Sequence, residues 1–215
     1  TEIYTLSLHD ALPISIAPMA ERPFPARGIL WGSQESGQNS FPTSTTAWER
    51  KYSSDPAPLQ KFGKAVADAQ VCVRIVDEYL LIPNKGKESP ADRVDKIMTW
   101  LPLSLAASDI RVLTKRHQEV GEDDLKKFQQ RARTTSNHVA RREKECRIEI
   151  RMHLTHPCCN FTHDRFAIVD DELWHFGGTV GGFHTDVSAV SRGWRAADHG
   201  AIDFFEEIWN SGVQK

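Results

Sequence analysis

Cysteine is scarce in this sequence, with only four among 215 residues. Cys158 and Cys159 are adjacent, unlike the spaced pairs of a disulfide framework, and Cys72 and Cys146 lie far from each other in the chain. This pattern favours a reducing compartment. We therefore expect a cytoplasmic location.

Long apolar runs are also missing, because no stretch approaches the roughly 20 apolar residues that cross a bilayer. The sequence thus predicts no transmembrane segment. An excess of charge of one sign is lacking too, since 27 basic and 29 acidic residues give a formal net charge of −2. The overall charge attracts neither nucleic acid nor an anionic membrane, so either partner would need a local basic patch.

Composition divides the chain into three parts. Residues 1–15 resemble a translated sequencing-adaptor read-through, and we expect an artefactual leader in which His9 and Asp10 have no role; a real amphipathic leader is the alternative. Residues 16–58 are rich in Pro, Ser, Thr and Gly without a helical or strand period, which predicts an extended or loop-rich arm. Residues 59–215 are long enough for one sizeable core and are expected to form one domain.

Helix and strand patterns alternate within residues 59–215. Apolar spacing predicts helices at residues 59–69, 91–101, 123–143 and 201–209, and β-branched or apolar runs predict strands at residues 71–82, 110–115, 166–170 and 173–176. Residues 146–154 alternate strictly, with Cys146, Ile148, Ile150, Met152 and Leu154 on one face of a half-buried strand. The predicted fold class is α/β, a mixed sheet flanked by helices on both faces.

The most informative segment is residues 162–182. In it His163, Arg165, Asp170 and Gly177 fall at the intervals H-x-R-x4-D-x6-G. An imidazole at a strand end can attack phosphorus, a cation can neutralise the nonbridging oxygens, and a carboxylate can fix the imidazole tautomer. The segment therefore predicts a site for phosphodiester chemistry.

This spacing resembles the H-x-K-x4-D-x6-G-S motif of the phospholipase D superfamily, and the residues HDRF and WHFG are similar to a divergent bacterial branch with Arg in place of Lys. The resemblance implies a phospholipase D-like half-site domain. It implies that His163 is nucleophile or acid, Arg165 the phosphate clamp and Asp170 a supporting carboxylate. It also implies no metal and no other cofactor, and a second histidine that protonates the leaving group.

The motif departs from that of the superfamily at two positions. Arg165 keeps the positive charge and can grip phosphate through two parallel donors, but its planar fork places the charge differently from an ammonium. The usual serine after Gly177 is replaced by Gly178, and Thr179 follows. We expect Arg165, Gly177, Gly178 and Thr179 to hold the phosphate, with backbone N–H groups of the turn contributing.

A dense group of potential metal ligands precedes the motif and consists of His153, His156, Cys158, Cys159 and His163. A zinc site is therefore an alternative. Adjacent cysteines do not form the usual C-x2-C pair, and His153 fits the polar face of a strand. We expect no metal site here.

One motif supplies half of a two-histidine site, so an active enzyme is expected to be a homodimer about a twofold axis. The alternative is a second acid within the chain, from His175, His184 or His199. The expected function is a nuclease-like phosphodiesterase acting through a phosphohistidine, with nucleic acid favoured over lipid because residues 123–143 are rich in Lys and Arg. The rival is an inactive module that binds phosphate groups of a nucleic acid, a lipid headgroup or a partner protein.

Overall fold

The computed structural model describes residues 24–31, 44–45, 48, 60–84, 86, 88–99, 106–118, 120–124, 126–127, 130–131, 134, 147–154, 162–181 and 188–211. Its strands are β1 (Gly28–Trp31), β2 (Cys72–Asp77), β3 (Asp109–Thr114), β4 (Arg147–Arg151), β5 (Phe166–Val169), β6 (Glu172–Phe176) and β7 (Ala189–Arg195). Its helices are α2 (Gln60–Asp68), α3 (Pro90–Met98), the short 3-10 helix η1 (Ala197–His199) and α5 (Ala201–Ser211).

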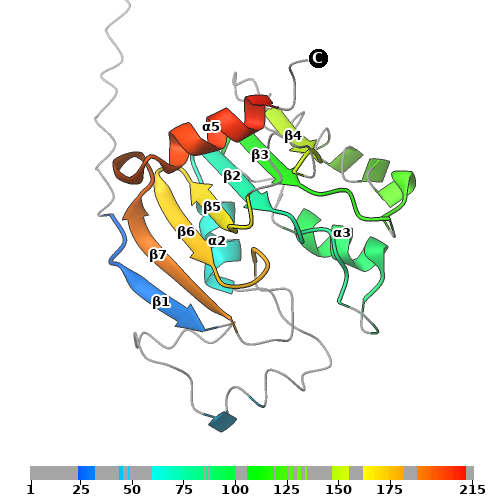
Figure 1. The fold of residues 1–215 in the computed structure, drawn as a ribbon, viewed down its shortest axis with the longest axis horizontal. Helices are drawn as coiled ribbons and strands as arrows, with labels where there is room; N and C mark the ends of the chain where they lie inside the picture. Colours follow the sequence, from blue (N-terminus) through cyan, green and yellow to red (C-terminus); the bar gives the residue numbers. More distant parts are fainter. Residues whose placement is uncertain are drawn as a thin grey trace, which may run out of the picture.

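The seven described strands form one mixed sheet in the order β1-β7-β6-β5-β2-β3-β4 (Figure 1). Strands β2, β3 and β4 are parallel to one another, whereas β5, β6, β7 and β1 each run antiparallel to their neighbours. Val76 near the end of β2 pairs with Phe166 at the start of β5. This register places the segment before β5 beside the segment after β2.

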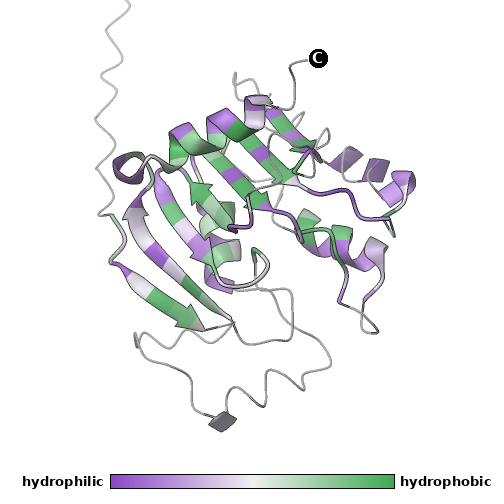
Figure 2. Ribbon diagram, in the orientation of Figure 1, coloured by the Kyte–Doolittle hydropathy of each residue, from purple (hydrophilic) through white to green (hydrophobic). Residues whose placement is uncertain are grey.

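Helices cover both faces of this sheet (Figure 1). On the first, called the α2 face, side chains of α2 and α3 share a core with alternate strand residues such as Val73, Ile75 and Trp174. On the second, called the α5 face, α5 packs on the intervening residues, among them Val76 and Phe166. Figure 2 shows that β5 is hydrophobic along its length, because both of its sides are buried. The predicted mixed α/β sheet flanked by helices is confirmed.

Most predicted elements that fall on described residues are confirmed, namely α2, α3, β3, the β5–β6 hairpin and α5. The strand predicted at residues 71–82 is confirmed only as β2, because it ends at Asp77 and residues 78–81 form a turn. Strand β4 is also present, and Ile148, Ile150 and Met152 pack on the α2-face core as predicted. Leu154 instead joins the α5-face core, because the regular strand ends at Arg151 and the alternation is not continued. Cys146 lies outside the described residues.

The predicted helix at residues 123–143 is described only in part. Residues 122–124, 126–127, 130–131 and 134 are helical, and the rest of that range lies outside the described part of the chain. Of the helices that are described, none has both the length and the apolar character needed to cross a membrane.

Strands β1 and β7 were not predicted. β7 carries Arg192, whose guanidinium stacks 4.1 Å from the centroid of Trp174 and pairs with Glu172 at 2.7 Å. β7 also contains Gly193, which has a φ of 90° and approaches the backbone of Arg27 so closely that a Cβ there would lie 2.6 Å from the Arg27 Cα. These long-range contacts hold a polar, glycine-containing strand that its own sequence pattern does not indicate.

Candidate active site

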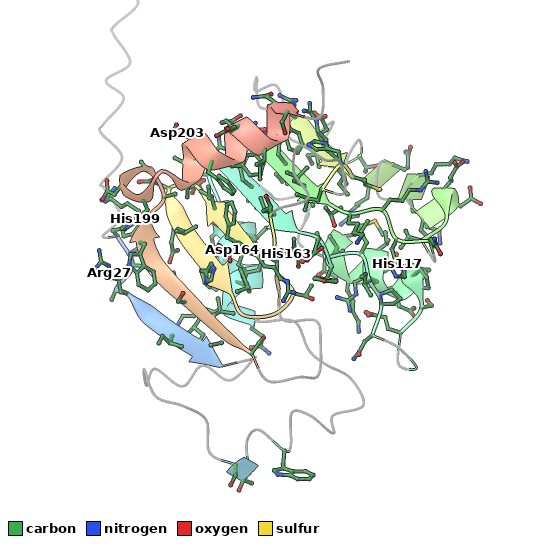
Figure 3. All side chains as sticks on the ribbon, in the orientation of Figure 1. Arg27, His117, His163, Asp164, His199 and Asp203 are labelled. Carbon is green, nitrogen blue, oxygen red and sulfur yellow. The ribbon has the colours of Figure 1, made fainter. Side chains whose placement is uncertain are left out.

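His163 and Arg165 lie directly before β5, at one edge of the sheet. Because β5 is antiparallel to both β2 and β6, its start lies beside the ends of these two strands. The same edge therefore gathers Asp77, the last residue of β2, and Glu78, which follows it. Figure 3 shows His163 at this edge, next to Asp164.

The imidazole of His163 is held by Glu78. Nδ1 of His163 lies 3.2 Å from Oε1 of Glu78, and the His163 side chain is 79% exposed whereas that of Glu78 is 14% exposed. A carboxylate accepts hydrogen bonds only, so in the neutral ring this contact assigns the proton to Nδ1 and leaves the lone pair on Nε2. The imidazole thus has a fixed tautomer and an exposed ring, as a nucleophile requires.

Arg165 is held by charge and stacking more than by hydrogen bonds. Its guanidinium lies 4.6 Å from the centroid of the Tyr79 ring, and its Nε lies 3.9 Å from Oδ1 of Asp77. Nη1 donates a long hydrogen bond of 3.4 Å to the carbonyl of Gly177, and Nε has no hydrogen-bond partner among the described residues. Nε is buried, but no hydrogen bond among the described residues uses Nη2, so that nitrogen remains available to the oxygens of a phosphate.

Asp77 is a buried carboxylate that sets the charge around Arg165. Its Oδ1 accepts the N–H of Tyr79 and its Oδ2 the N–H of Val180, each at 2.8 Å. Burial raises the pKa of Asp77 to about 6, although these two N–H groups and the charge of Arg165 lower it. Asp77 thus joins the glycine turn to the end of β2, and it is ionised beside Arg165 at neutral pH.

The loop that carries Glu78 and Tyr79 is anchored by a buried ion pair. Nη2 of Arg93, on α3, lies 2.6 Å from Oε2 of Glu88, and both side chains are almost fully buried. The same carboxylate oxygen accepts the N–H of Asn84 at 2.9 Å. Ser89 caps α3 and forms a capping box with Asp92. These contacts fix the position of the loop on which the candidate site is built.

Asp170 lies at the opposite end of β5 from His163. Four extended residues separate it from Arg165, a span of roughly 16 Å. Its carboxylate accepts the backbone N–H groups of Gln70, Val71 and Cys72 at 2.7 to 3.2 Å. The expected role of Asp170 beside the imidazole is therefore corrected: the carboxylate in contact with His163 is that of Glu78, and Asp170 fixes the start of β2.

The glycine turn, residues 177–181, contributes the Gly177 carbonyl as an acceptor for Arg165, whereas its backbone N–H groups were expected to donate to a phosphate. The N–H of Gly177 donates to the carbonyl of Ala189 at 2.9 Å, so it is not available to a phosphate. A Cβ on Gly178 would lie 2.7 Å from Oγ of Ser188, which shows how closely the turn packs. Thr179 is buried. The structure therefore brings Gly177 to Arg165, while phosphate contact by Gly178 and Thr179 stays a prediction.

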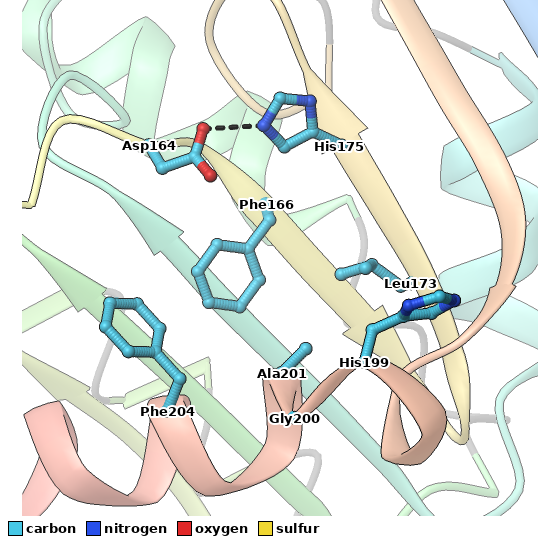
Figure 4. Close-up of a pocket in the computed structure, with 8 residues that line it drawn as sticks. All are labelled: Asp164, Phe166, Leu173, His175, His199, Gly200, Ala201 and Phe204. Carbon is cyan, nitrogen blue, oxygen red and sulfur yellow. Dashed lines mark hydrogen bonds and ion pairs between the residues drawn. The ribbon is translucent and has the colours of Figure 1, made fainter.

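The other histidines of the sequence have different surroundings. Nε2 of His153 donates to the carbonyl of Ile208 at 3.0 Å, and Nε2 of His175 lies 2.6 Å from Oδ1 of Asp164. His175 and His199 line a pocket on the α5 face (Figure 4). Arg165 instead contacts Asp77, which alternates with Val73 and Ile75 on the α2 face.

The alternative metal site is described only in part. Within the described ranges, no group of three or more His, Cys, Asp and Glu side chains is placed to hold a metal ion. His156, Cys158 and Cys159 lie outside those ranges, as does His184. Lys126 and Lys127, from the predicted basic helix, are exposed and pair with Asp123 and Asp124 at 3.1 and 3.9 Å.

Sequence reasoning missed Asp77 and Glu78. The signal that could have identified them is a pair of carboxylates directly after a buried β-branched strand, the position where polar groups often reach a site at a sheet edge. Their contact with His163 and Arg165 depends on β5 pairing with β2, which no local pattern gives.

No protein-family model and no curated protein sequence matches this chain. Among solved structures, it is similar to TrmBL2, an archaeal chromatin protein with a novel mode of DNA binding, at 11% identity and a TM-score of 0.43 over 88% of this chain and 54% of that one. It is also similar to NucT from Helicobacter pylori, at 9% identity and a TM-score of 0.46 over 86% and 98% of the two chains.

This chain spans about half the length of the TrmBL2 chain that it matches. Both TM-scores lie below 0.5, so these likenesses assign neither a family nor a function to the protein.

Proposed function

We propose that this protein is a metal-independent phosphodiesterase of phospholipase D type that cleaves its substrate through a phosphohistidine at His163. The observation that carries the proposal is the 3.2 Å contact between Nδ1 of the exposed His163 imidazole and Glu78, at the sheet edge where Arg165 makes only one long hydrogen bond to the described residues. An oriented nucleophile and a cation for the phosphate are the two groups that a phosphohistidine mechanism needs first.

The reaction would proceed in two displacements at phosphorus. Nε2 of His163 attacks, the N–P bond forms, and the P–O bond to the leaving group breaks as an acid gives that oxygen a proton. Arg165 neutralises the nonbridging oxygens as their charge grows, and Glu78 stabilises the ring that has become cationic. Water then attacks phosphorus and gives its proton to the former acid, the N–P bond breaks, and the imidazole is restored.

The acid is proposed to come from a second copy of the chain. In-line displacement needs the nucleophile and the acid on opposite sides of phosphorus, and His175 and His199 line the α5-face pocket rather than the surroundings of Arg165. A homodimer that pairs two His163 edges supplies the acid and places two Arg165 side chains around one phosphate. Light scattering should therefore give the mass of a dimer, and a monomer that still cleaves would require the acid to be His175, His184 or His199.

The proposed substrate is a phosphodiester of nucleic acid, cleaved in the cytoplasm. The direct test incubates the protein with single- and double-stranded DNA and RNA and with phospholipid vesicles, always with a chelator present. Wild type is compared with His163→Asn and with His117→Asn, the same change on the loop after β3. We expect cleavage of nucleic acid by wild type and by His117→Asn, and none by His163→Asn.

Two results would count against this function. Cleavage that persists in His163→Asn, or that the chelator abolishes, would exclude the phosphohistidine route. Tight binding of oligonucleotides without any cleavage would instead identify the inactive phosphate-binding module.

A further inference from the structure

A pocket of about 230 Å³ opens on the α5 face, close to the candidate active site in sequence but on the other side of β5 (Figure 4). Its walls are apolar and partly aromatic. The rings of Phe166, on β5, and Phe204, on α5, lie with their centroids 6.1 Å apart and their planes tilted by 41°. The volume is below the roughly 300 Å³ at which pockets for drug-sized ligands begin, so the pocket suits one small planar group.

The rim of this pocket carries hydrogen-bonding groups that are only partly used. Asp164 accepts a hydrogen bond from Nε2 of His175 through Oδ1 at 2.6 Å. Oδ2 of Asp164, Nδ1 of His175 and the ring nitrogens of His199 have no hydrogen-bond partner within the described residues. Figure 4 shows the Asp164–His175 pair at one end and His199 at the other.

The chemistry of this lining selects a class of ligand. No Lys or Arg is present among its described residues, and a carboxylate is, so an anionic group is disfavoured. The aromatic walls suit a flat ring, because phenylalanine can stack on the face of any planar base. A carboxylate oxygen and two imidazoles suit a ring whose edge bears both N–H donors and nitrogen or oxygen acceptors.

We infer that this pocket binds a nucleobase of the substrate. The inference rests on the proposed function, because Asp164 stands in the chain between His163 and Arg165, each one peptide unit of about 3.8 Å away. Alternation along the chain turns Asp164 to the α5 face and Arg165 toward Asp77. A nucleotide strand that crosses this end of β5 would place its phosphate at His163 and a base in the pocket.

Nucleosides test the pocket independently of the active site, since they carry no phosphate. Adenosine and cytidine are titrated into 15N-labelled wild type and into Arg165→Ala, with ribose and indole as comparison ligands, and the amide signals of Gly200 and Ala201 are followed. We expect both nucleosides to shift these signals equally in the two proteins. Ribose should not shift them, and indole should bind more weakly because it lacks a ring acceptor.

Variants of the pocket locate the binding. Phe204→Leu should weaken nucleoside affinity by up to about 5- to 150-fold, the range expected when one base-stacking side chain is removed. Asp164→Asn should weaken it as well. Phe24→Leu and Asp198→Asn make the same changes outside the pocket and should leave the affinity unchanged.

The outcomes separate this inference from the proposed function. If nucleosides do not shift the signals, the base pocket is refuted. It is also refuted if indole binds as tightly as the nucleosides and Asp164→Asn does not change its affinity, because the pocket would then suit an apolar protein side chain. Nucleoside binding without cleavage of any nucleic acid would uphold the pocket and refute the phosphodiesterase. If nucleosides do not bind, and DNA with an abasic site is cleaved with the same KM as intact DNA, the phosphodiesterase would be upheld and the base pocket refuted.

Discussion

Nδ1 of His163 lies 3.2 Å from Oε1 of Glu78, although the two residues are 85 positions apart in the sequence. The contact arises because β5 pairs antiparallel with β2, so the segment before one strand meets the segment after the other. Glu78 is largely buried, whereas the imidazole that it holds is exposed. The tautomer of the candidate nucleophile is therefore set by the pairing of two strands and not by a residue within the H-x-R motif.

Glu78→Gln should lower kcat by on the order of 10-fold or more and leave KM nearly unchanged, because the amide keeps the size of the side chain but loses the charge that stabilises the cationic ring. Glu122→Gln makes the same change at an exposed site and should have no effect on either constant. A rise in KM as large as the fall in kcat, or a loss of the folded state, would indicate that Glu78 acts by holding the loop and not on the imidazole.

Arg165→Lys should keep part of the activity or improve it, because it retains the positive charge that attracts the phosphate oxygens. Arg165→Ala removes this charge and should lose phosphate affinity. Binding of inorganic phosphate and steady-state kinetics measure both effects. Arg195→Ala removes a half-exposed guanidinium on β7 and serves as the control. Equal losses in the two Arg165 variants would show that the planar fork itself is needed.

Stability should fall as pH rises from about 4.5 to about 6.5. Burial raises the pKa of Asp77 to about 6, so the folded state binds a proton that the unfolded state, with a pKa near 3.8, has released. The loss is at most about 3 kcal/mol, from about 1.4 kcal/mol per pKa unit. Arg111 and Arg151 lower the pKa of Glu206 and Glu149, respectively, and these groups affect stability below about pH 4.5, with the opposite sign.

Urea unfolding across this pH range measures the effect. Asp77→Asn cannot titrate and should flatten the curve, whereas Asp95→Asn, on the exposed side of α3, should leave its slope unchanged. A wild-type stability that is constant or rises between pH 4.5 and 6.5 would contradict the assignment of a raised pKa to Asp77.

Asp170→Asn should cost about 1–3 kcal/mol of stability while the folded protein keeps its activity. Asp170 has a φ of 56°, which Asn tolerates, so the change isolates the charge that binds three N–H groups at the start of β2. Thermal unfolding and cleavage well below the unfolding temperature measure the two effects. Loss of activity in a variant that remains folded would show that the Asp170 carboxylate is needed for catalysis.

The core elements of the fold were predictable because their sequences carry a local pattern. Residues 71–82 form a β-branched run, and residues 201–209 have the apolar spacing of a helix that covers one face. β7 has no such pattern, since its stability depends on Arg192 stacking on Trp174 and on Gly193 admitting the backbone of Arg27, directly before β1. Both contacts are long-range.

The candidate site was predictable only in part, for the same reason. The H-x-R spacing identified His163 and Arg165, which the structure places at one edge. Spacing alone could not show that a four-residue strand carries Asp170 to the opposite end, nor that Glu78 takes its expected place. Those positions follow from the order of strands in the sheet.

The central claim is tested most directly by trapping the covalent intermediate. Wild type turning over a labelled oligonucleotide is quenched in alkali, in which an N–P bond to histidine survives, and the adduct is located by peptide mass spectrometry. The account predicts a nucleotidyl group on the peptide that contains His163, lost on acid treatment and absent in His163→Asn. Cleavage that proceeds with no adduct on this peptide, or with an adduct on another residue, would contradict it.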